Sequence, residues 1–451
     1  NWRKDNQGND LKPSPIESPA WIQSKIYDNS GYVMEPLALY LTEGDHTISL
    51  LGLREPLLLK EIKLTNGDRP KAYAELMAKE QKEASAKQVE IRIEAENADR
   101  TSSQMLYPVQ DQASSDVYPV SPKYLLNNSI GGNSWRLVNQ WIEWDFEVPE
   151  DGYYNITLYD KQNFSRGIDV CRRIYIDGMV PFAEMDAYYF SYEQNWRKDT
   201  LQDESGTPFR FYLTKGSHTL RMEVVLGKMS SIISAVQECL LRLNGIYRSV
   251  IYITGVSPDQ FRDYQLERML PGLEQELIDA REILHYAIAS MESTAGSNSD
   301  KMTVLRTMDD QLNDLIEDQE LFVEVLSNYR TNVRALGNWI NQVLPQPLQI
   351  DRIYIHTEDV NPKIEGNDFV SRFTHEMKRL YYSFIIDFNS VGNVSADSED
   401  TTVLTLWIGA GRDQANVIKS LIDEKFTPDT GININLQLVD MGALMRAVLS
   451  G

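Results

Sequence analysis

The sequence predicts a multidomain chain that combines antiparallel β-sandwiches of the jelly-roll type, a helical bundle and the beginning of an α/β unit. Three observations lead to this fold class: an internal repeat in strand-like sequence, a series of apolar stripes at helical spacing, and a nearly unbroken apolar run close to the C-terminus. With 451 residues the chain is too long for one compact core. Several domains are therefore expected.

The first element is a duplicated module. The pentapeptide NWRKD occurs at Asn1–Asp5 and again at Asn195–Asp199, and each copy is followed by a related segment, EPLALYLTEGDHT from Glu35 and TPFRFYLTKGSHT from Thr207. These segments align without a gap as P-x-x-x-Y-L-T-x-G-x-H-T, which indicates an internal duplication. The chain is thus expected to begin inside a first jelly roll, whose C-terminal part occupies residues 1–66.

The first copy is longer than the second. Trp2 lies 44 residues before His46, whereas Trp196 lies only 22 residues before His218, so the first copy contains an insertion that we expect to form a loop. A linker helix is predicted over residues 67–87.

The second copy is predicted to be a complete jelly roll over residues 88–256. Residues 140–148 (QWIEWDFEV) alternate between apolar and polar side chains, the two-residue period of a half-buried strand. PEDG then turns the chain and YYNITLYD resumes the alternation. Short strands at this spacing predict an antiparallel sandwich.

Apolar residues at spacings of three and four predict a helical bundle over residues 257–390. Four stripes begin at Leu266, Met302, Leu321 and Val370, and four amphipathic helices suffice for a bundle. Between the third and fourth stripes, LQIDRIYIH has the pattern of a strand, which we expect to join a neighbouring sheet.

The last element is an α/β unit over residues 403–451, preceded by a polar linker at residues 391–402. Val403–Ile408 is almost wholly apolar, which is typical of a parallel strand covered on both faces. An amphipathic helix and a second alternating strand follow, so the order is β-α-β and then a further helix.

Several motifs in the second copy occur in an informative order. IRIEAENA comes first, then a Trp-x-x-Trp strand before PEDGYY, then the Ile-Asp-Gly turn of RRIYIDGMVPF, all within residues 91–227. Together they resemble the jelly-roll carbohydrate-binding modules that are attached to glycoside hydrolases. The resemblance implies that this domain binds a poly- or oligosaccharide.

Two loops, GGNSWRLVNQW and KQNFSRG, are placed like the ligand-binding loops of such modules. Aromatic faces stack on sugar rings, while amides and guanidinium groups bond to hydroxyls. The predicted carbohydrate-binding residues are Asn133, Trp135, Arg136, Gln162, Asn163 and Arg166. The alternative is that Trp135 caps the edge of the sandwich and that the polar residues are ordinary loop residues.

The same resemblance implies a structural calcium ion. Such modules hold calcium with two glutamates of the opening strand and an aspartate near the end of the last strand. Glu94 and Glu96 match the two glutamates and fall on one face of the predicted strand. The segment expected to close the sandwich, YRSVIYITG, contains no aspartate. The sequence therefore leaves the third ligand unassigned.

Residues 403–451 resemble the first lobe of bacterial extracellular solute-binding proteins, the periplasmic-binding-protein-like receptors of carbohydrate ABC importers. The features are a strand ending in Trp, a Gly-rich bend, a helix closing in Glu-Lys-Phe, and Thr-Gly-Ile before an alternating strand. In such lobes the ligand lies beyond the carboxyl ends of the strands, so Gly411 and Arg412 of the bend would face it. The alternative is a plain turn with Arg412 in solvent.

A subset of these receptors from Gram-positive bacteria is similar over the whole chain. The resemblance implies an extracellular lipoprotein anchored at the cell surface, with permease subunits and a sugar as partners. The net charge of −22 disfavours nucleic acid and anionic membranes. No catalytic carboxylate pair lies in a recognisable motif, so we expect no enzyme activity. A non-catalytic region of a glycoside hydrolase and a purely structural stalk remain open as alternatives.

Overall fold

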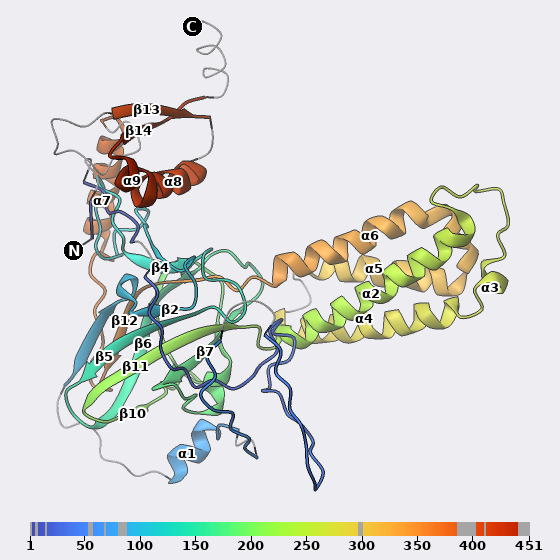
Figure 1. The fold of residues 1–451 in the computed structure, drawn as a ribbon, viewed down its shortest axis with the longest axis horizontal. Helices are drawn as coiled ribbons and strands as arrows, with labels where there is room; N and C mark the ends of the chain where they lie inside the picture. The colour runs from blue at the N-terminus through green and yellow to red at the C-terminus, as the bar shows by residue number, and fades with distance from the viewer. Residues whose placement is uncertain are drawn as a thin grey trace, which may run out of the picture.

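The computed structural model describes residues 2–4, 8–13, 16–52, 57–66, 69–79, 88–295, 301–385, 403–409 and 412–440. A β-sandwich lies at its centre, a long helical bundle projects from one end of the sandwich, and a small α/β unit follows near the C-terminus (Figure 1). None of the helices in these ranges is long and apolar enough to cross a membrane.

The sandwich consists of two antiparallel sheets. One has seven strands in the order β10-β6-β12-β4-β3, with β1 paired to β12 and β9 paired to β6, and the other has five in the order β2-β5-β11-β7-β8. Their bounds are β1 (Glu90–Glu94), β2 (Arg100–Thr101), β3 (Pro108–Val109), β4 (Ser129–Gly132), β5 (Trp141–Val148), β6 (Gly152–Gln162), β7 (Val170–Ile176), β8 (Tyr188–Phe190), β9 (Glu193–Thr200), β10 (Phe211–Leu213), β11 (Gly216–Val225) and β12 (Leu348–His356).

The alternation in β5 produces the core as predicted. Ile142, Trp144 and Phe146 are buried between the sheets, and the indole nitrogen of Trp144 donates to the carbonyl of Ala95 at 2.9 Å. The antiparallel sandwich predicted from the sequence is therefore confirmed.

The strand that closes the sandwich, β12, follows the whole bundle in the sequence. β12 is buried along its whole length and pairs with β1, β4 and β6. The predicted boundary at residue 256 differs from the structure, since residues 229–254 are helical and belong to the bundle. An apolar, β-branched run such as VIYIT fits a strand or a buried helix equally well by periodicity, which explains the difference.

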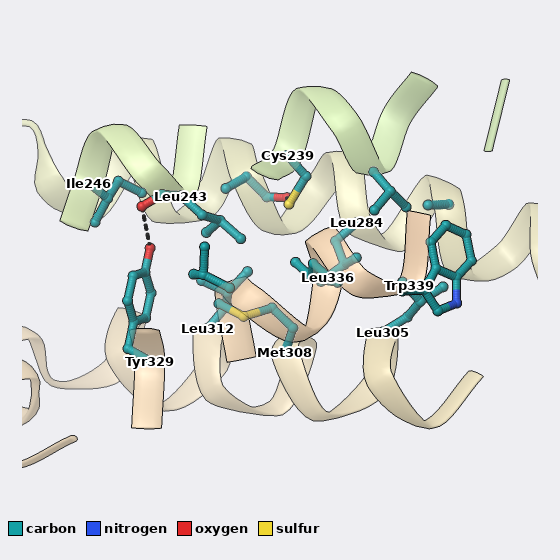
Figure 2. Close-up of a cluster of buried hydrophobic side chains, with 14 of the residues drawn as sticks. Cys239, Leu243, Ile246, Leu284, Leu305, Met308, Leu312, Tyr329, Leu336 and Trp339 are labelled. Carbon is teal, nitrogen blue, oxygen red and sulfur yellow. Dashed lines mark hydrogen bonds between the residues drawn. The ribbon is translucent and has the colours of Figure 1, made fainter. Parts of the chain in front are cut away.

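The bundle contains α2 (Met229–Thr254), α4 (Leu273–Ala295), α5 (Met302–Glu317) and α6 (Phe322–Val343), with the short α3 (Leu266–Met269) between α2 and α4. Leucine and methionine side chains from these helices fill its core (Figure 2). Two polar groups inside it are satisfied: Tyr329 donates to the carbonyl of Leu243 at 3.0 Å, and Trp339 donates to that of Lys301 at 2.9 Å.

The helix predicted as the fourth member of the bundle lies elsewhere. α7 (Phe369–Ser383) follows the sandwich, and its His375 is hydrogen-bonded to the carbonyl of Gln112. Its apolar stripe, including Phe373 and Met377, is exposed. The apolar stripe correctly predicts a helix, but it does not show which surface, if any, packs against that helix.

The C-terminal unit has the predicted β-α-β order. β13 (Val403–Ile408) pairs in parallel with β14 (Asn433–Leu438), and between them lie α8 (Arg412–Leu421), a π-helical turn (Ile422–Phe426) and α9 (Thr427–Thr430). Ala415 and Leu436 form its small core. The parallel pairing confirms the predicted β-α-β order.

Each repeat copy contains the same hydrogen bond between its histidine and a threonine carbonyl. In the second copy the Nε2 atom of His218 lies 2.7 Å from the carbonyl oxygen of Thr214, and in the first copy that of His46 lies 2.7 Å from the carbonyl oxygen of Thr42. Within the described part of residues 2–66, however, no strand forms besides an isolated bridge. α1 (Tyr73–Lys79) lies within the segment predicted as a linker helix.

Candidate functional site

The β4–β5 and β6–β7 loops meet at one end of the sandwich. A Cβ atom added to Gly132 would lie 3.8 Å from a ring carbon of Phe164, so the two loops are neighbours. On the first loop, the guanidinium of Arg136 donates to the side-chain oxygen of Asn133 at 2.7 Å. The structure therefore brings together the two loops in which the carbohydrate-binding residues were predicted.

Two of the six predicted residues are buried. Trp135 has no exposed surface; its indole donates to the carbonyl of Gln140 at 3.2 Å, and the guanidinium of Arg172 lies 4.1 Å from its ring centroid. Gln162 donates to the carbonyls of Ser165 and Ile168. Trp135 is thus part of the core, in agreement with the alternative interpretation, and Gln162 shapes the loop from inside.

The remaining four residues, Asn133, Arg136, Asn163 and Arg166, are not buried. A further exposed side chain in these loops, which the sequence analysis did not single out, is Phe164; it is 55% exposed and follows Asn163. An exposed phenylalanine in a loop flanked by amide and guanidinium groups can stack on a sugar ring while its neighbours bond to hydroxyls. The phenylalanine was visible in the motif KQNFSRG, but the stacking contact was predicted for Trp135 instead.

A second cluster lies where β1 ends beside β12. The side chains of Glu94, Glu96 and Asp351 each offer an oxygen, and these oxygens lie within 4.8 Å of one another. Asp351 sits where the register of β12 shifts between Ile350 and Arg352, and such bulges redirect side chains. Asp351 supplies the third carboxylate that the sequence left unassigned.

Burial dominates the electrostatics of this cluster. It raises the pKa of Glu96 to about 8, and it raises the pKa of Asp351 to about 7 although Arg352 opposes the shift. Arg92 pairs with Glu94 at 2.7 Å, and Asp351 accepts from Arg352 and from the backbone of Tyr118.

One oxygen of each glutamate is left without a partner. The Oε2 atoms of Glu94 and Glu96 are buried and make no hydrogen bond to any residue that the structure describes. Two buried carboxylate oxygens without donors, next to a third carboxylate from Asp351, suit a hard divalent cation such as calcium. The donor set therefore fits the predicted ion.

The third predicted site is only partly described. Gly411 lies outside the described residues, and Arg412 begins α8 with a side chain that is likewise outside them.

Comparison with known proteins identifies the bundle. Residues 231–343 match the family model for the bacterial solute-binding protein 4-helix bundle domain, which is the α2–α6 region. This part of the chain is therefore similar to that helical domain. A search of curated protein sequences gave no match.

Solved structures show weaker likenesses. A cycloisomaltooligosaccharide glucanotransferase from Paenibacillus sp. has a TM-score of 0.23 and 16% identity over 46% of this chain and 27% of its own. A family 35 carbohydrate binding module from Clostridium thermocellum has a TM-score of 0.22 and 15% identity over 30% of this chain and 87% of its own. A ruminal GH26 endo-beta-1,4-mannanase has a TM-score of 0.20 and 20% identity over 32% and 24%. Likenesses at TM-scores this low do not establish a shared fold.

Proposed function

We propose that this chain belongs to the substrate-binding component of a bacterial carbohydrate ABC importer, anchored at the cell surface. The match of residues 231–343 to the helical domain of bacterial solute-binding proteins carries the proposal. The parallel pair β13 and β14, connected through α8, supports it because a receptor lobe is expected to begin in this way. Permease subunits would then be the protein partners.

We further propose that the sandwich holds a poly- or oligosaccharide at its loops. Phe164 would stack on a sugar ring, with Asn133, Arg136, Asn163 and Arg166 as partners for hydroxyls. These side chains include no carboxylic acid to protonate a glycosidic oxygen and no carboxylate to act as nucleophile or general base, and glycoside hydrolysis commonly uses such a pair. Their chemistry favours binding without catalysis.

Calcium would have a structural role. Glu94, Glu96 and Asp351 would hold the ion and so tie β1 to β12, the strand that arrives after the bundle. The ion would supply positive charge to carboxylates that are otherwise costly to ionise when buried.

A glycan array probed with the full chain tests the carbohydrate proposal, followed by calorimetry on any glycan retained. We expect Phe164→Ala to weaken binding about tenfold, the size of one lost aromatic contact. Phe261→Ala is the control, since Phe261 is 98% exposed and lies outside the loops. Absence of binding to every neutral and acidic glycan on the array would refute a carbohydrate ligand.

A further inference from the structure

A second concave surface lies on the side of the bundle, away from the residues discussed so far. It is a solvent-open groove of about 510 Å³ on α2 and α4. Ala235 and Ile283 contribute apolar surface to it, and Tyr32, from the first repeat copy, lines it together with Tyr286. Grooves of this volume accommodate one or two sugar rings.

Tyr32 is held at the groove by a structured loop. The carboxylate of Asp28 accepts from the backbone of Tyr32 at 2.8 Å, and Tyr32 packs against the core of the bundle. Gly31 has a φ of +72°, and a Cβ atom there would lie 2.7 Å from Val138, so the loop is pressed against the sandwich. The insertion that distinguishes the first copy, SPAWIQSKIYDNSGYVM at residues 18–34, thus contacts both the sandwich and the bundle, and the blue segment at the base of α2 and α4 follows this path (Figure 1).

The polar groups of the groove are available to a ligand. Among the described residues, the hydroxyls of Ser231 and Ser234 and the carboxylate of Glu282 have no hydrogen-bond or ion-pair partner. Glu238 makes only a long contact of 3.3 Å with Arg242. Tyr286 is 54% exposed. The hydroxyls of Tyr32 and Tyr286 likewise have no partner within the part of the chain that the structure describes. Tyrosine rings and hydroxyls beside carboxylates have the chemistry that recognises a sugar.

We propose that this groove is a second carbohydrate subsite, which binds a neutral hexose unit of the glycan held by the sandwich loops. The proposal rests on the proposed carbohydrate function and extends it to the bundle. Glu238 and Glu282 select against acidic sugars by repulsion. Tyr32, which lines the groove, follows Gly31 in the sequence, and Gly31 packs against Val138. Val138 lies two residues after Arg136 of the loop site. The two subsites therefore lie on neighbouring segments of the same surface region.

The test uses the full chain with cellohexaose and maltohexaose, two neutral hexasaccharides that differ in linkage. Hydrogen–deuterium exchange should show that at least one of them protects peptides covering residues 231–238 and 282–286. Tyr286→Ala should lower the affinity five- to tenfold. Tyr252→Ala, a change of a 92% exposed tyrosine at the other end of α2, should leave it unchanged.

The outcomes separate the two proposals. If Phe164→Ala abolishes binding while Tyr286→Ala changes nothing and the helices gain no protection, the groove is not a subsite and the loop site stands. If protection of the helices persists in Phe164→Ala, the groove binds sugar independently. If tetramethylammonium protects the helices and neither hexasaccharide does, the tyrosines and glutamates form a cation site and the inference is overturned.

Discussion

The sandwich and the bundle are assembled in opposite ways. The bundle is made from one continuous stretch, α2 to α6, in which successive helices pack against one another and α6 returns to α2. The sandwich is interrupted: β1 at Glu90–Glu94 pairs with β12 at Leu348–His356, with the whole bundle between them. A contiguous unit can form mainly from contacts close in sequence, whereas the sandwich is complete only when a strand from far along the chain has paired.

Their interiors differ as well. Among the described residues of α2 to α6, no charged side chain is buried, whereas the sandwich buries Asp160, Arg172, Arg352 and, to varying degrees, the carboxylates of Glu94, Glu96 and Asp351. Apolar cores respond little to pH or ions, and buried charges respond strongly. Solution conditions should therefore affect the sandwich more than the bundle.

The largest expected effect is the loss of the sandwich without β12. A fragment of residues 88–256, the domain predicted from the sequence, should not form a cooperative tertiary structure, because β6 and β1 lose their central partner. A fragment of residues 88–368 in which a short Gly/Ser linker replaces residues 229–343 should fold. Near-ultraviolet circular dichroism and thermal melting distinguish the two. A cooperative melt of residues 88–256 would show that β12 is dispensable.

A cavity in the bundle should destabilise the bundle alone. Leu312 is fully buried in its core, and Leu312→Ala should cost about 2–5 kcal/mol (Figure 2). Hydrogen exchange should accelerate in bundle peptides and remain unchanged in sandwich peptides. Leu241→Ala, at an exposed position of α2, should cost less than about 0.5 kcal/mol. Equal acceleration in both regions would mean that they unfold as one unit.

The same contrast explains what the sequence could predict. The alternation of Ile142, Trp144 and Phe146 and the stripe of Leu305, Met308 and Leu312 are local patterns, and each led to the correct element and core. β13, α8 and β14 were equally readable because a βαβ unit is local.

The errors involve contacts that local patterns do not encode. The strand character of β12 was visible, but its partners β1 and β6 were not. Asp351 was not predicted as the third carboxylate for the same reason, since its place beside Glu94 depends on that pairing. Trp135 shows a different limit, because a tryptophan in a loop sequence can still lie fully inside the core.

Calcium should stabilise the sandwich and leave the bundle unaffected. At a concentration 100 times its Kd, the ion should add about 2.7 kcal/mol to the free energy of unfolding of the sandwich. The raised pKa values of Glu96, about 8, and Asp351, about 7, mean that the calcium-free folded protein binds more protons than the unfolded chain. Its stability should therefore fall as the pH rises toward 8, and the gain from calcium should be larger at pH 8 than at pH 5.

Thermal melts with and without calcium measure this effect. Glu96→Gln, in the 3-10 turn (Ala95–Asn97) that follows β1, should abolish the calcium response, whereas Glu90→Gln, at the exposed start of β1, should retain it. A response that survives both Glu96→Gln and Asp351→Asn would place the ion elsewhere.

The smallest effect compares the two copies of the repeat through one histidine. Burial lowers the pKa of His218, but hydrogen bonds to the Thr214 carbonyl and to Asp177 at 2.7 Å outweigh it, so the pKa lies above its ordinary value. Both partners accept, which favours the doubly protonated ring. The stabilisation is therefore complete below about pH 6.5 and is lost as the pH rises through the folded-state pKa. His218→Gln should cost about 1 kcal/mol at pH 6, and less at pH 9, in sandwich melts. The exposed His46→Gln should cost nothing measurable. An equal loss in both variants would contradict a role for Asp177, which is hydrogen-bonded to His218, whereas the ring of His46 is hydrogen-bonded to the Thr42 carbonyl.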